Sequence, residues 1–346
     1  MKLLITGASG FLGKYIVAAA LRRGHPVRAV VRSSVDTTRL PWYDHPSVDF
    51  VALDLHQPDG IVEALHGVDA VIHLAAAKTG NYEAQYASTV VATQNLIDAM
   101  IEANVLRLIA IGTFSVFDYL QLQSGTTVNE ETPIDRSPAQ RDVYAQTKLI
   151  QESVFRDFEQ NQGGQVTILR PGMIYGRDAL WNACLGVNVK DKLWIRIGTD
   201  AQLPLTYVEN CADAIVLAAE CDGAIAKTIN LVDDDLPTQN TYASELAKRM
   251  TTPPSILIRW SVMRLLTDLI WSCNQLLLRG RAKLPGLFIP ARLHARFKPL
   301  RYSNDRAKQL LNWHPKYDLS SALDRSCSTV ELLSVPQEIP NPKSKI

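Results

Sequence analysis

Three glycines near the N-terminus constrain this chain more than any other feature. In the opening stretch MKLLITGASGFLGKYIV, Gly7, Gly10 and Gly13 separate a short apolar run from a segment of helix-forming residues. The helical segment ends at Gly24, a natural C-terminal cap, and the apolar run Val27–Val31 follows. Because glycine has no Cβ, this spacing allows a tight turn between a strand and a helix. The pattern predicts a β-α-β unit.

A glycine turn of this kind lets the backbone approach a pyrophosphate, and the helix N-terminus offers it unpaired N–H groups and a positive dipole end. The alternative is a turn that serves only close packing of the helix on the strand. The β-α-β context favours a dinucleotide site. The residues that we expect to hold the dinucleotide are Gly7, Gly10, Phe11, Leu12 and Gly13.

Short apolar runs alternate with longer helix-compatible segments in the first half of the chain. This predicts an α/β fold, a Rossmann-type doubly wound parallel sheet with helices on both faces. The six expected strands are Lys2–Thr6, Val27–Val31, Val48–Leu53, Ala70–Leu74, Leu106–Ile111 and Val166–Leu169. We expect residues 1–175 to form a nucleotide-binding domain to which 204–232 return, and 176–334 to form mainly a smaller, interleaved substrate domain. A frayed tail is expected over 335–346.

Composition excludes several classes of function. The 346 residues are 47% hydrophobic, enough for a large core, and 36 basic against 35 acidic residues leave a formal charge of +1. This balance predicts a small-molecule partner and no nucleic acid. The five cysteines lack CxxC spacing and the histidines lack HxxxH spacing, so we expect neither a disulfide framework nor a metal site. Met1 runs into the first strand without a signal peptide, which predicts a cytoplasmic protein.

Arg32 bears on the choice of cofactor. It stands just after the second expected strand, where an NAD-specific site usually presents a carboxylate to the ribose 2′-hydroxyl. A guanidinium makes paired hydrogen bonds to phosphate and stays charged, so it suits the 2′-phosphate of NADP. We therefore expect NADP, with NAD as the alternative if Arg32 is only a solvated side chain past the strand end. Arg28 is interpreted as a solvated residue of that kind.

Separate motifs, in order along nearly the whole chain, carry a resemblance to a known family. Besides TGASGFLG they are DL at 54–55, HLAA at 73–76, GTFSVF at 112–117, YAQTK at 144–148, LRPGMIYG at 169–176 and TYVENCADA at 206–214. The chain resembles the extended short-chain dehydrogenase/reductase family of the epimerase/dehydratase superfamily. The resemblance implies the fold expected above and an NAD(P)-dependent enzyme.

Tyr144 and Lys148 are the expected catalytic pair. Their spacing of four places both on one face of a segment that reads as helix through Glu159. A phenol titrates near pH ~10, and a nearby ammonium favours the phenolate, so Tyr144 can exchange a proton. The resemblance implies that Lys148 also binds the nicotinamide ribose and that Thr113 polarises the substrate oxygen. The alternative, a surface Tyr–Lys pair, leaves the glycine turn and Thr113 unexplained.

The resemblance also assigns further contacts to the cofactor. It implies Asp54 and Leu55 at the adenine, Ala75 and Ala76 in the wall of the cofactor cleft, and Pro171, Gly172 and Ile174 beside the nicotinamide. The small and apolar members of this set are also compatible with ordinary strand-end packing. His73 is interpreted as a core residue. Thr89 stands where many relatives have asparagine, which puts an ordered-water proton relay in doubt.

The stretch 255–278, SILIRWSVMRLLTDLIWSCNQLLL, predicts an amphipathic helix with Arg264, Asp268 and Gln275 on its polar face. The apolar face contains Val262, Leu265, Leu266, Leu269, Cys273, Leu276 and Leu277. Its longest stretch without a charge, 269–278, is too short to span a bilayer. We expect this face to pack against the protein, as core or as a lid on an apolar substrate. Peripheral contact with a membrane is the alternative.

Three functions compete. A long apolar insertion resembles the 3β-hydroxysteroid dehydrogenase branch, which implies an NADP-dependent oxidoreductase acting on a sterol-like, terpenoid or phenylpropanoid alcohol or ketone. A sugar-nucleotide epimerase or dehydratase with tightly bound NAD is second, although dehydratases usually have acidic residues where Phe114 and Ser115 follow Thr113. The third is a non-catalytic NADP-binding regulator, and such relatives commonly lose the tyrosine. The oligomeric state stays open, with a homodimer as one possibility.

Overall fold

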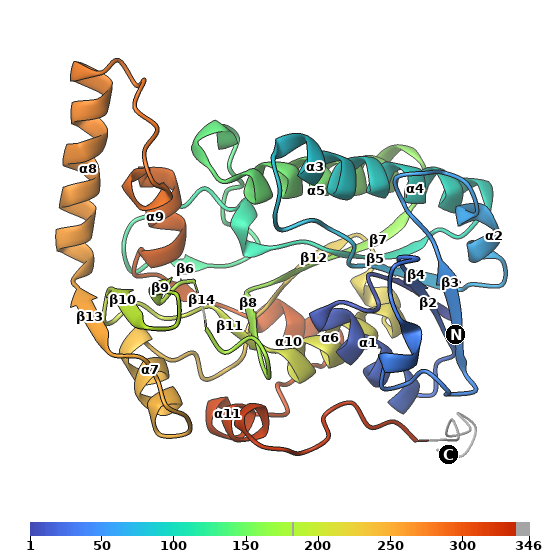
Figure 1. Cartoon of the computed structure of the whole chain (residues 1–346). Helices are drawn as coiled ribbons and strands as arrows, with labels where there is room; N and C mark the ends of the chain where they lie inside the picture. The colour runs from blue at the N-terminus through green and yellow to red at the C-terminus, as the bar shows by residue number, and fades with distance from the viewer. Residues whose placement is uncertain (182, 337–346) are drawn as a thin grey trace.

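A seven-stranded, all-parallel sheet forms the centre of the computed structural model, which describes residues 1–181 and 183–336 (Figure 1). Its strands run in the order β12-β7-β5-β4-β1-β2-β3. Their bounds are β1 Leu3–Thr6, β2 Val27–Val31, β3 Val48–Ala52, β4 Ala70–His73, β5 Arg107–Ile111, β7 Gln165–Pro171 and β12 Lys227–Leu231. The predicted fold class is confirmed. Six of these strands were expected, whereas β12, which pairs with β7 at the sheet edge, was not named as a strand.

Helices cover both faces of the sheet (Figure 1). On one face α1 packs against α6, and on the other α2, α4 and α5 bury a second apolar cluster against the strands. The bounds are α1 Phe11–Arg22, α2 Ile61–Leu65, α3 Tyr82–Tyr86, α4 Ala92–Glu102, α5 Val143–Asn161 and α6 Val208–Glu220. Runs of alanine in α1 and α6, Ala18–Ala20 among them, let these two helices approach closely because a methyl group takes little space.

The remaining elements are interleaved with the sheet. β11 pairs with β8 beyond the end of β7, and the chain then returns through α6 to place β12 in the main sheet. The bounds are β6 Thr127–Val128, β8 Met173–Tyr175, β9 Gly186–Val189, β10 Leu193–Ile197, β11 Leu205–Tyr207, β13 Ser255–Ile258, β14 Arg301–Tyr302, α7 Gln239–Ala247, α8 Trp260–Leu277, α9 Pro290–Phe297, α10 Asp305–Leu311 and α11 Leu319–Cys327. The division into two domains stays a prediction, and most of the expected frayed tail, 337–346, lies outside the described residues.

The predicted helix over 255–278 differs from the structure in two ways. Residues 255–258 form β13, which pairs in parallel with β10, so the helix begins only at Trp260. The face that α8 buries consists of Met263, Thr267 and Asn274. The expected apolar face is instead exposed; Leu265, for example, is 70% accessible. The prediction that this face packs against the chain is therefore wrong for the single chain.

Within the described part of the chain, no helix combines the length and apolar character that crossing a bilayer requires.

Candidate active site

The predicted site residues converge at one edge of the sheet. Gly7 follows β1, Ala75 follows β4, Thr113 follows β5 and Gly172 follows β7. These strands are parallel, so their carboxyl ends lie along the same edge. The chain order reverses between β1 and β4, and in open α/β sheets the crevice at such a reversal is where ligands bind.

The glycine turn has the shape expected of a pyrophosphate cradle. Gly7 has a φ of +69°, and a Cβ on Gly13 would lie 2.2 Å from the carbonyl oxygen of Gly7. Gly10 is exposed and begins α1 without any side-chain cap, and the first turn of α1 has no acidic residue. The first N–H groups of the helix are therefore free to bind an anion. The turn fits a dinucleotide phosphate.

Two of the residues expected at the adenosine end of the cofactor, Arg32 and Asp54, lie just beyond β2 and β3. Arg32 is exposed, and among the described residues no hydrogen bond or ion pair holds its guanidinium. Arg28 is different, because it pairs with Asp49 at 2.8 Å and donates to two carbonyls, so it is structural rather than solvated. Asp54 is exposed and accepts from the His56 amide at 3.1 Å.

Tyr144 lies in the first turn of α5, which begins where the Asp142 side chain accepts from the Ala145 amide at 2.9 Å. The Thr113 side chain, just after β5, lowers the pKa of the Tyr144 phenol on α5, so the two groups lie near each other. Thr113 Oγ1 also accepts from the Ser115 amide at 3.2 Å, which fixes the hydroxyl at this position. The structure thus brings together two of the three expected catalytic residues directly.

Burial raises the pKa of Tyr144, and the Thr113 side chain only partly opposes this effect. We expected the nearby ammonium to favour the phenolate, but desolvation dominates. A phenol with a raised pKa keeps its proton at neutral pH.

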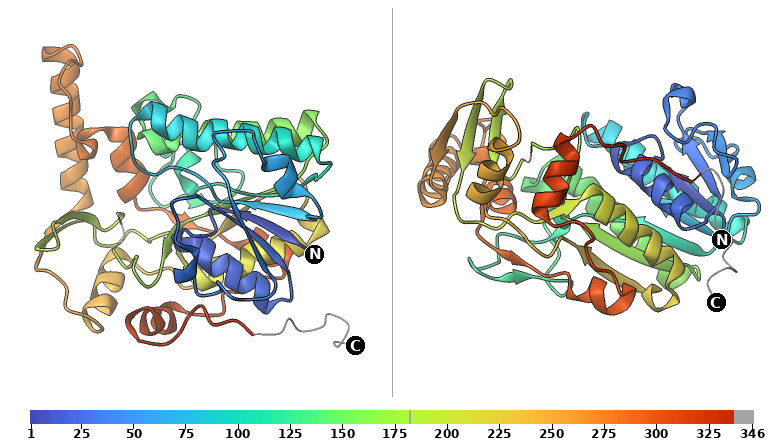
Figure 2. Two further views of the ribbon diagram at one scale, coloured as in Figure 1. Left: turned by 45° about the vertical axis from the view of Figure 1, so that its right-hand side comes forward. Right: turned by 90° about the horizontal axis from the view of Figure 1, so that it is seen from below.

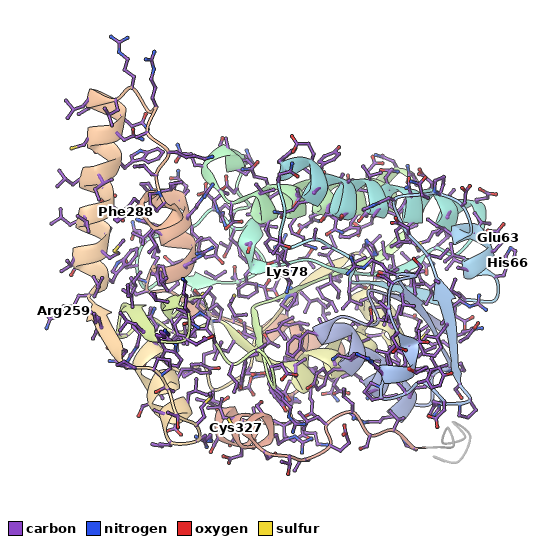
Figure 3. The ribbon with its side chains drawn as sticks, in the orientation of Figure 1. Glu63, His66, Lys78, Arg259, Phe288 and Cys327 are labelled. Atoms are coloured by element: carbon purple, nitrogen blue, oxygen red, sulfur yellow. The ribbon has the colours of Figure 1, made fainter. Side chains whose placement is uncertain are left out.

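Lys148 lies one turn further along α5 and is buried. Its ammonium donates to the carbonyl of Ile111 at 2.6 Å and to Oε1 of Gln151. Burial lowers the Lys148 pKa to about 7; Glu152 opposes the shift and Lys78 adds to it. Lys78 is exposed and lies near the middle of the molecule in Figure 3. Glu152 is itself held by the buried Arg170.

A buried chain of hydrogen bonds extends from Lys148 into the sheet. Gln151 Nε2 donates to Thr93 Oγ1 at 2.7 Å, and Thr93 donates to the Thr89 carbonyl at 2.6 Å. With its proton used there, Thr93 can only accept from His73 Nε2, which lies 2.8 Å away. His73 Nδ1 then accepts from the hydroxyl of Thr6 at 2.8 Å.

This assignment makes His73 a neutral imidazole with its proton on Nε2. Burial, with a smaller effect of the Lys148 charge, lowers the His73 pKa to about 3, which agrees with the neutral form. The interpretation of His73 as a core residue is confirmed. Sequence reasoning missed Gln151 and Thr93, although Gln151 follows Lys148 by three positions and so lies on the same helical face.

Comparison with known proteins identifies this arrangement. A model of the NAD dependent epimerase/dehydratase family matches residues 3–231. The chain belongs to this family. It is thus an NAD(P)-dependent enzyme of the extended short-chain dehydrogenase/reductase type, as the motifs predicted.

Similar proteins include sterol and steroid dehydrogenases by sequence and a UDP-sugar epimerase by structure. Sterol-4-alpha-carboxylate 3-dehydrogenase, decarboxylating, of Mus musculus is 28% identical over 337 residues, which cover 94% of this chain and 90% of that protein. 3-beta-Hydroxysteroid dehydrogenase of Mycolicibacterium neoaurum is 28% identical over 63% of this chain and 61% of its own length. The structure of UDP-glucuronic acid 4-epimerase from Bacillus cereus in complex with NAD matches with a TM-score of 0.71 at 20% identity, covering 94% and 97% of the two chains. This last likeness shows the fold.

Membership of the family makes a nicotinamide dinucleotide the cofactor, and the glycine turn fits it. The other expected contacts lie around the same edge of the sheet: Phe11 and Leu12 in the first turn of α1, Leu55 after β3, Ala75 and Ala76 after β4, Pro171 at the end of β7, and Gly172 and Ile174 at and within β8. A Cβ on Gly172 would lie 2.1 Å from the Pro204 carbonyl, so this glycine is required by packing whatever it binds. The cofactor roles of these residues stay predictions.

The expected lid, α8, lies on the far side of α9 from the catalytic helix α5 (Figure 1). α9 lies next to α5: Arg292 donates to the carbonyls of Gln140 and Arg141 at 3.1 Å, and Arg296 approaches Asp142 at 3.8 Å. α8 packs on the outer side of α9 and the turn Gly286–Phe288. Among residues 1–181 and 183–336 no three His, Cys, Asp or Glu side chains gather as metal ligands.

Proposed function

We propose that this enzyme is an NADP-dependent oxidoreductase that interconverts an alcohol and a ketone or aldehyde on a bulky, apolar, sterol-like substrate. The observation that carries the proposal is the grouping of Tyr144, Thr113 and the buried Lys148, one helical turn from Tyr144, at the strand ends of a nicotinamide-dependent fold. The sterol and steroid dehydrogenases among the relatives support the substrate class. Terpenoid and phenylpropanoid carbonyls belong to the same class of apolar compounds.

In this proposal the nicotinamide, when bound, supplies or accepts the hydride. Tyr144 holds the exchanged proton on its phenol oxygen and gives it to the carbonyl oxygen during reduction. The Thr113 hydroxyl, fixed by the Ser115 amide, donates a hydrogen bond to the same substrate oxygen and polarises it. Lys148 holds the nicotinamide ribose with an ammonium whose position is set by Ile111 and Gln151. Burial raises the pKa of Tyr144, so the phenol carries the proton at neutral pH.

Arg32 supports NADP as the preferred cofactor. Its exposed guanidinium, free of partners within the described residues, stands just beyond β2. A planar guanidinium matches the geometry of a phosphate monoester, whereas a 2′-hydroxyl would leave most of its donors unused. The proposed set around NADP is Gly7, Gly10, Phe11, Leu12, Gly13, Arg32, Asp54, Leu55, Ala75, Ala76, Tyr144, Lys148, Pro171, Gly172 and Ile174.

A direct assay tests this function. The purified full-length protein is incubated with NADPH or NADH and a panel that contains a 3-ketosteroid, a monoterpenoid ketone, an aromatic aldehyde and UDP-glucose. We expect oxidation of NADPH that depends on an apolar carbonyl and is lost in Tyr144→Phe. Interconversion of UDP-sugars without added cofactor would establish the epimerase instead. Cofactor binding without turnover of any compound would support the non-catalytic alternative.

A further inference from the structure

The exposed apolar side chains of this enzyme are concentrated on one projecting element. Of the eighteen large hydrophobic residues that the described chain exposes, nine lie between positions 256 and 278. They are Ile256, Leu257, Val262, Leu265, Leu266, Leu269, Leu276, Leu277 and Leu278. Single exposed leucines are ordinary on protein surfaces, but a continuous apolar face of this length normally marks a binding surface.

α8 stands away from the body of the molecule as an arm, joined to it at β13 and along α9 (Figures 1 and 2). Figure 3 labels Arg259 at the base of this arm and Phe288 on the segment that returns beside it. Met263 packs against α9, and Thr267 bonds to the turn Gly286–Phe288 that precedes α9. The exposed leucines lie on a different face of α8. Packing within the chain therefore leaves the leucine face uncovered.

The tip of the arm is a built structure rather than a frayed helix end. Asn274 is buried; its Oδ1 accepts from the Ala282 amide at 3.1 Å and its Nδ2 donates to the Ala282 carbonyl at 3.2 Å. The amides of Leu278 and Gly280 both donate to the Asn274 carbonyl. These bonds close the turn after α8 and hold Leu276, 81% exposed, and Leu277, 77% exposed, at the outer end.

The arm and the segment that returns from it through α9 are strongly basic. From Arg259 to Lys298 there are eight lysines and arginines and a single acidic residue, Asp268, which gives +7. The whole chain is only +1, so the remaining residues carry −6. Three of these cations, Arg279, Arg281 and Lys283, follow the exposed leucines at the tip directly. All three are exposed, and none of their charged groups has a hydrogen-bond or ion-pair partner among the residues that the structure describes.

We propose that α8 and its basic tip are a monotopic anchor that docks on an anionic lipid bilayer. An apolar helical face enters the headgroup and acyl boundary, while the flanking lysine and arginine side chains bind anionic headgroups. A second copy of this chain fits the surface less well, because pairing two such arms brings together two clusters that each carry +4 between Arg259 and Lys283. The proposal goes beyond the catalytic function and does not depend on it.

Vesicle cosedimentation of the full-length protein tests this anchor. We expect binding to phosphatidylcholine vesicles that contain phosphatidylglycerol, weak binding to pure phosphatidylcholine, and loss of the difference at high salt. Leu276→Ser with Leu277→Ser should weaken binding by at least ~100-fold, because each buried leucine contributes a factor of about 10 or more. Val330→Ser, which removes an exposed side chain outside the arm, is the control.

A pair of matched double variants tests the contribution of the basic residues to binding. Arg279→Gln with Arg281→Gln should weaken binding to anionic vesicles by about 30-fold, roughly fivefold for each basic residue. Arg39→Gln with Lys227→Gln removes the same charge from exposed positions outside the arm and should leave binding unchanged. All variants alter exposed side chains, so their unfolding curves should match that of the wild type.

Two outcomes would overturn the proposal. The first is a wild-type protein that stays in the supernatant with anionic vesicles. The second is a leucine double variant that binds vesicles as the wild type does. Sedimentation equilibrium without lipid tests whether a second copy of this chain covers the leucine face instead. The face would be assigned to a second copy if the wild type is a dimer, the leucine double variant is a monomer, and neither binds vesicles.

Discussion

Gln151 should set the protonation of the lysine in the active site without touching the substrate. In the structure its Oε1 accepts from the Lys148 ammonium, and its amide nitrogen is fixed by Thr93. Lys148 has a pKa of about 7 because burial outweighs the other effects, so its charge is lost as the pH rises through neutrality. Any change at Gln151 that favours or disfavours the ammonium must therefore move the pH at which that charge disappears.

Two substitutions at Gln151 should move the pH profile in opposite directions. Gln151→Glu places a carboxylate beside the ammonium, which raises the Lys148 pKa and shifts the alkaline limb of kcat/KM to higher pH. Gln151→Leu removes the acceptor, which lowers the pKa and shifts that limb to lower pH. A hydrogen bond to a charged group is worth about 1.5–3 kcal/mol, so Gln151→Leu should also reduce kcat/KM by ~10- to 100-fold near neutral pH.

The assay is steady-state NADPH oxidation with the best carbonyl substrate, measured from pH 5 to pH 10 for the wild type and both variants. A purely structural role for Gln151 predicts lower activity in both variants with an unmoved pH profile. Alkaline limbs that coincide in all three proteins would refute the reasoning.

Three further predictions concern the cofactor turn, cofactor choice and the arm. Gly13→Ala should weaken NADPH binding by at least ~10-fold in calorimetry, because the added Cβ would lie 2.2 Å from a carbonyl oxygen. Gly223→Ala is the control and should leave NADPH affinity unchanged, because its added Cβ would meet only a sulfur atom at 3.7 Å. Equal NADPH affinities in the two variants would contradict this prediction. Arg32→Ala should weaken NADPH binding by ~1.5–3 kcal/mol and spare NADH; equal losses for both cofactors would remove the argument. Met263→Ala should lower the free energy of unfolding by ~2–5 kcal/mol, measured with denaturant, because the Met263 side chain is only 3% exposed. Leu269→Ala should lower it by less than ~0.5 kcal/mol, because Leu269 is 60% exposed. Similar losses in the two variants would show that both faces of α8 are packed.

The strands of the sheet were predictable because strands buried on both faces read as continuous apolar runs. β12 was not predicted as a strand because its sequence, KTINL, is not a continuous apolar run. It begins with Lys227 and Thr228 at the edge of the sheet and contains the polar Asn230. Residues 255–258 were assigned to a helix because SILI is apolar, yet isoleucine favours strands and β10 offers a parallel partner.

The orientation of α8 could not be predicted from its pattern. Hydrophobic periodicity indicates which side chains share a face, and we assumed that the most apolar face is the packed one. In the structure the packed face includes Thr267, whose hydroxyl donates to the Leu287 carbonyl at 2.9 Å, and Asn274, which closes the turn at the tip. Those polar partners belong to a segment that follows α8, and no local pattern reveals them.

The candidate site was predictable where residue type dictates chemistry and hidden where partners are distant in sequence. Gly13, Tyr144 and Lys148 each follow from a short motif. The network behind Lys148 joins Gln151 to Thr93, 58 residues away, and then to His73, so only the folded chain shows that it exists. The direction of the Tyr144 pKa likewise depends on burial, which the motif does not contain.

Transfer of deuterium from NADPH that carries deuterium at both nicotinamide C4 positions tests the proposed oxidoreductase most directly. With a 3-ketosteroid, the wild type should give an alcohol that carries one deuterium on the former carbonyl carbon. Tyr144→Phe should form it at least ~100-fold more slowly with nearly unchanged NADPH affinity, because only the proton donor is removed. An unlabelled alcohol, or undiminished turnover by Tyr144→Phe, would contradict the assignment.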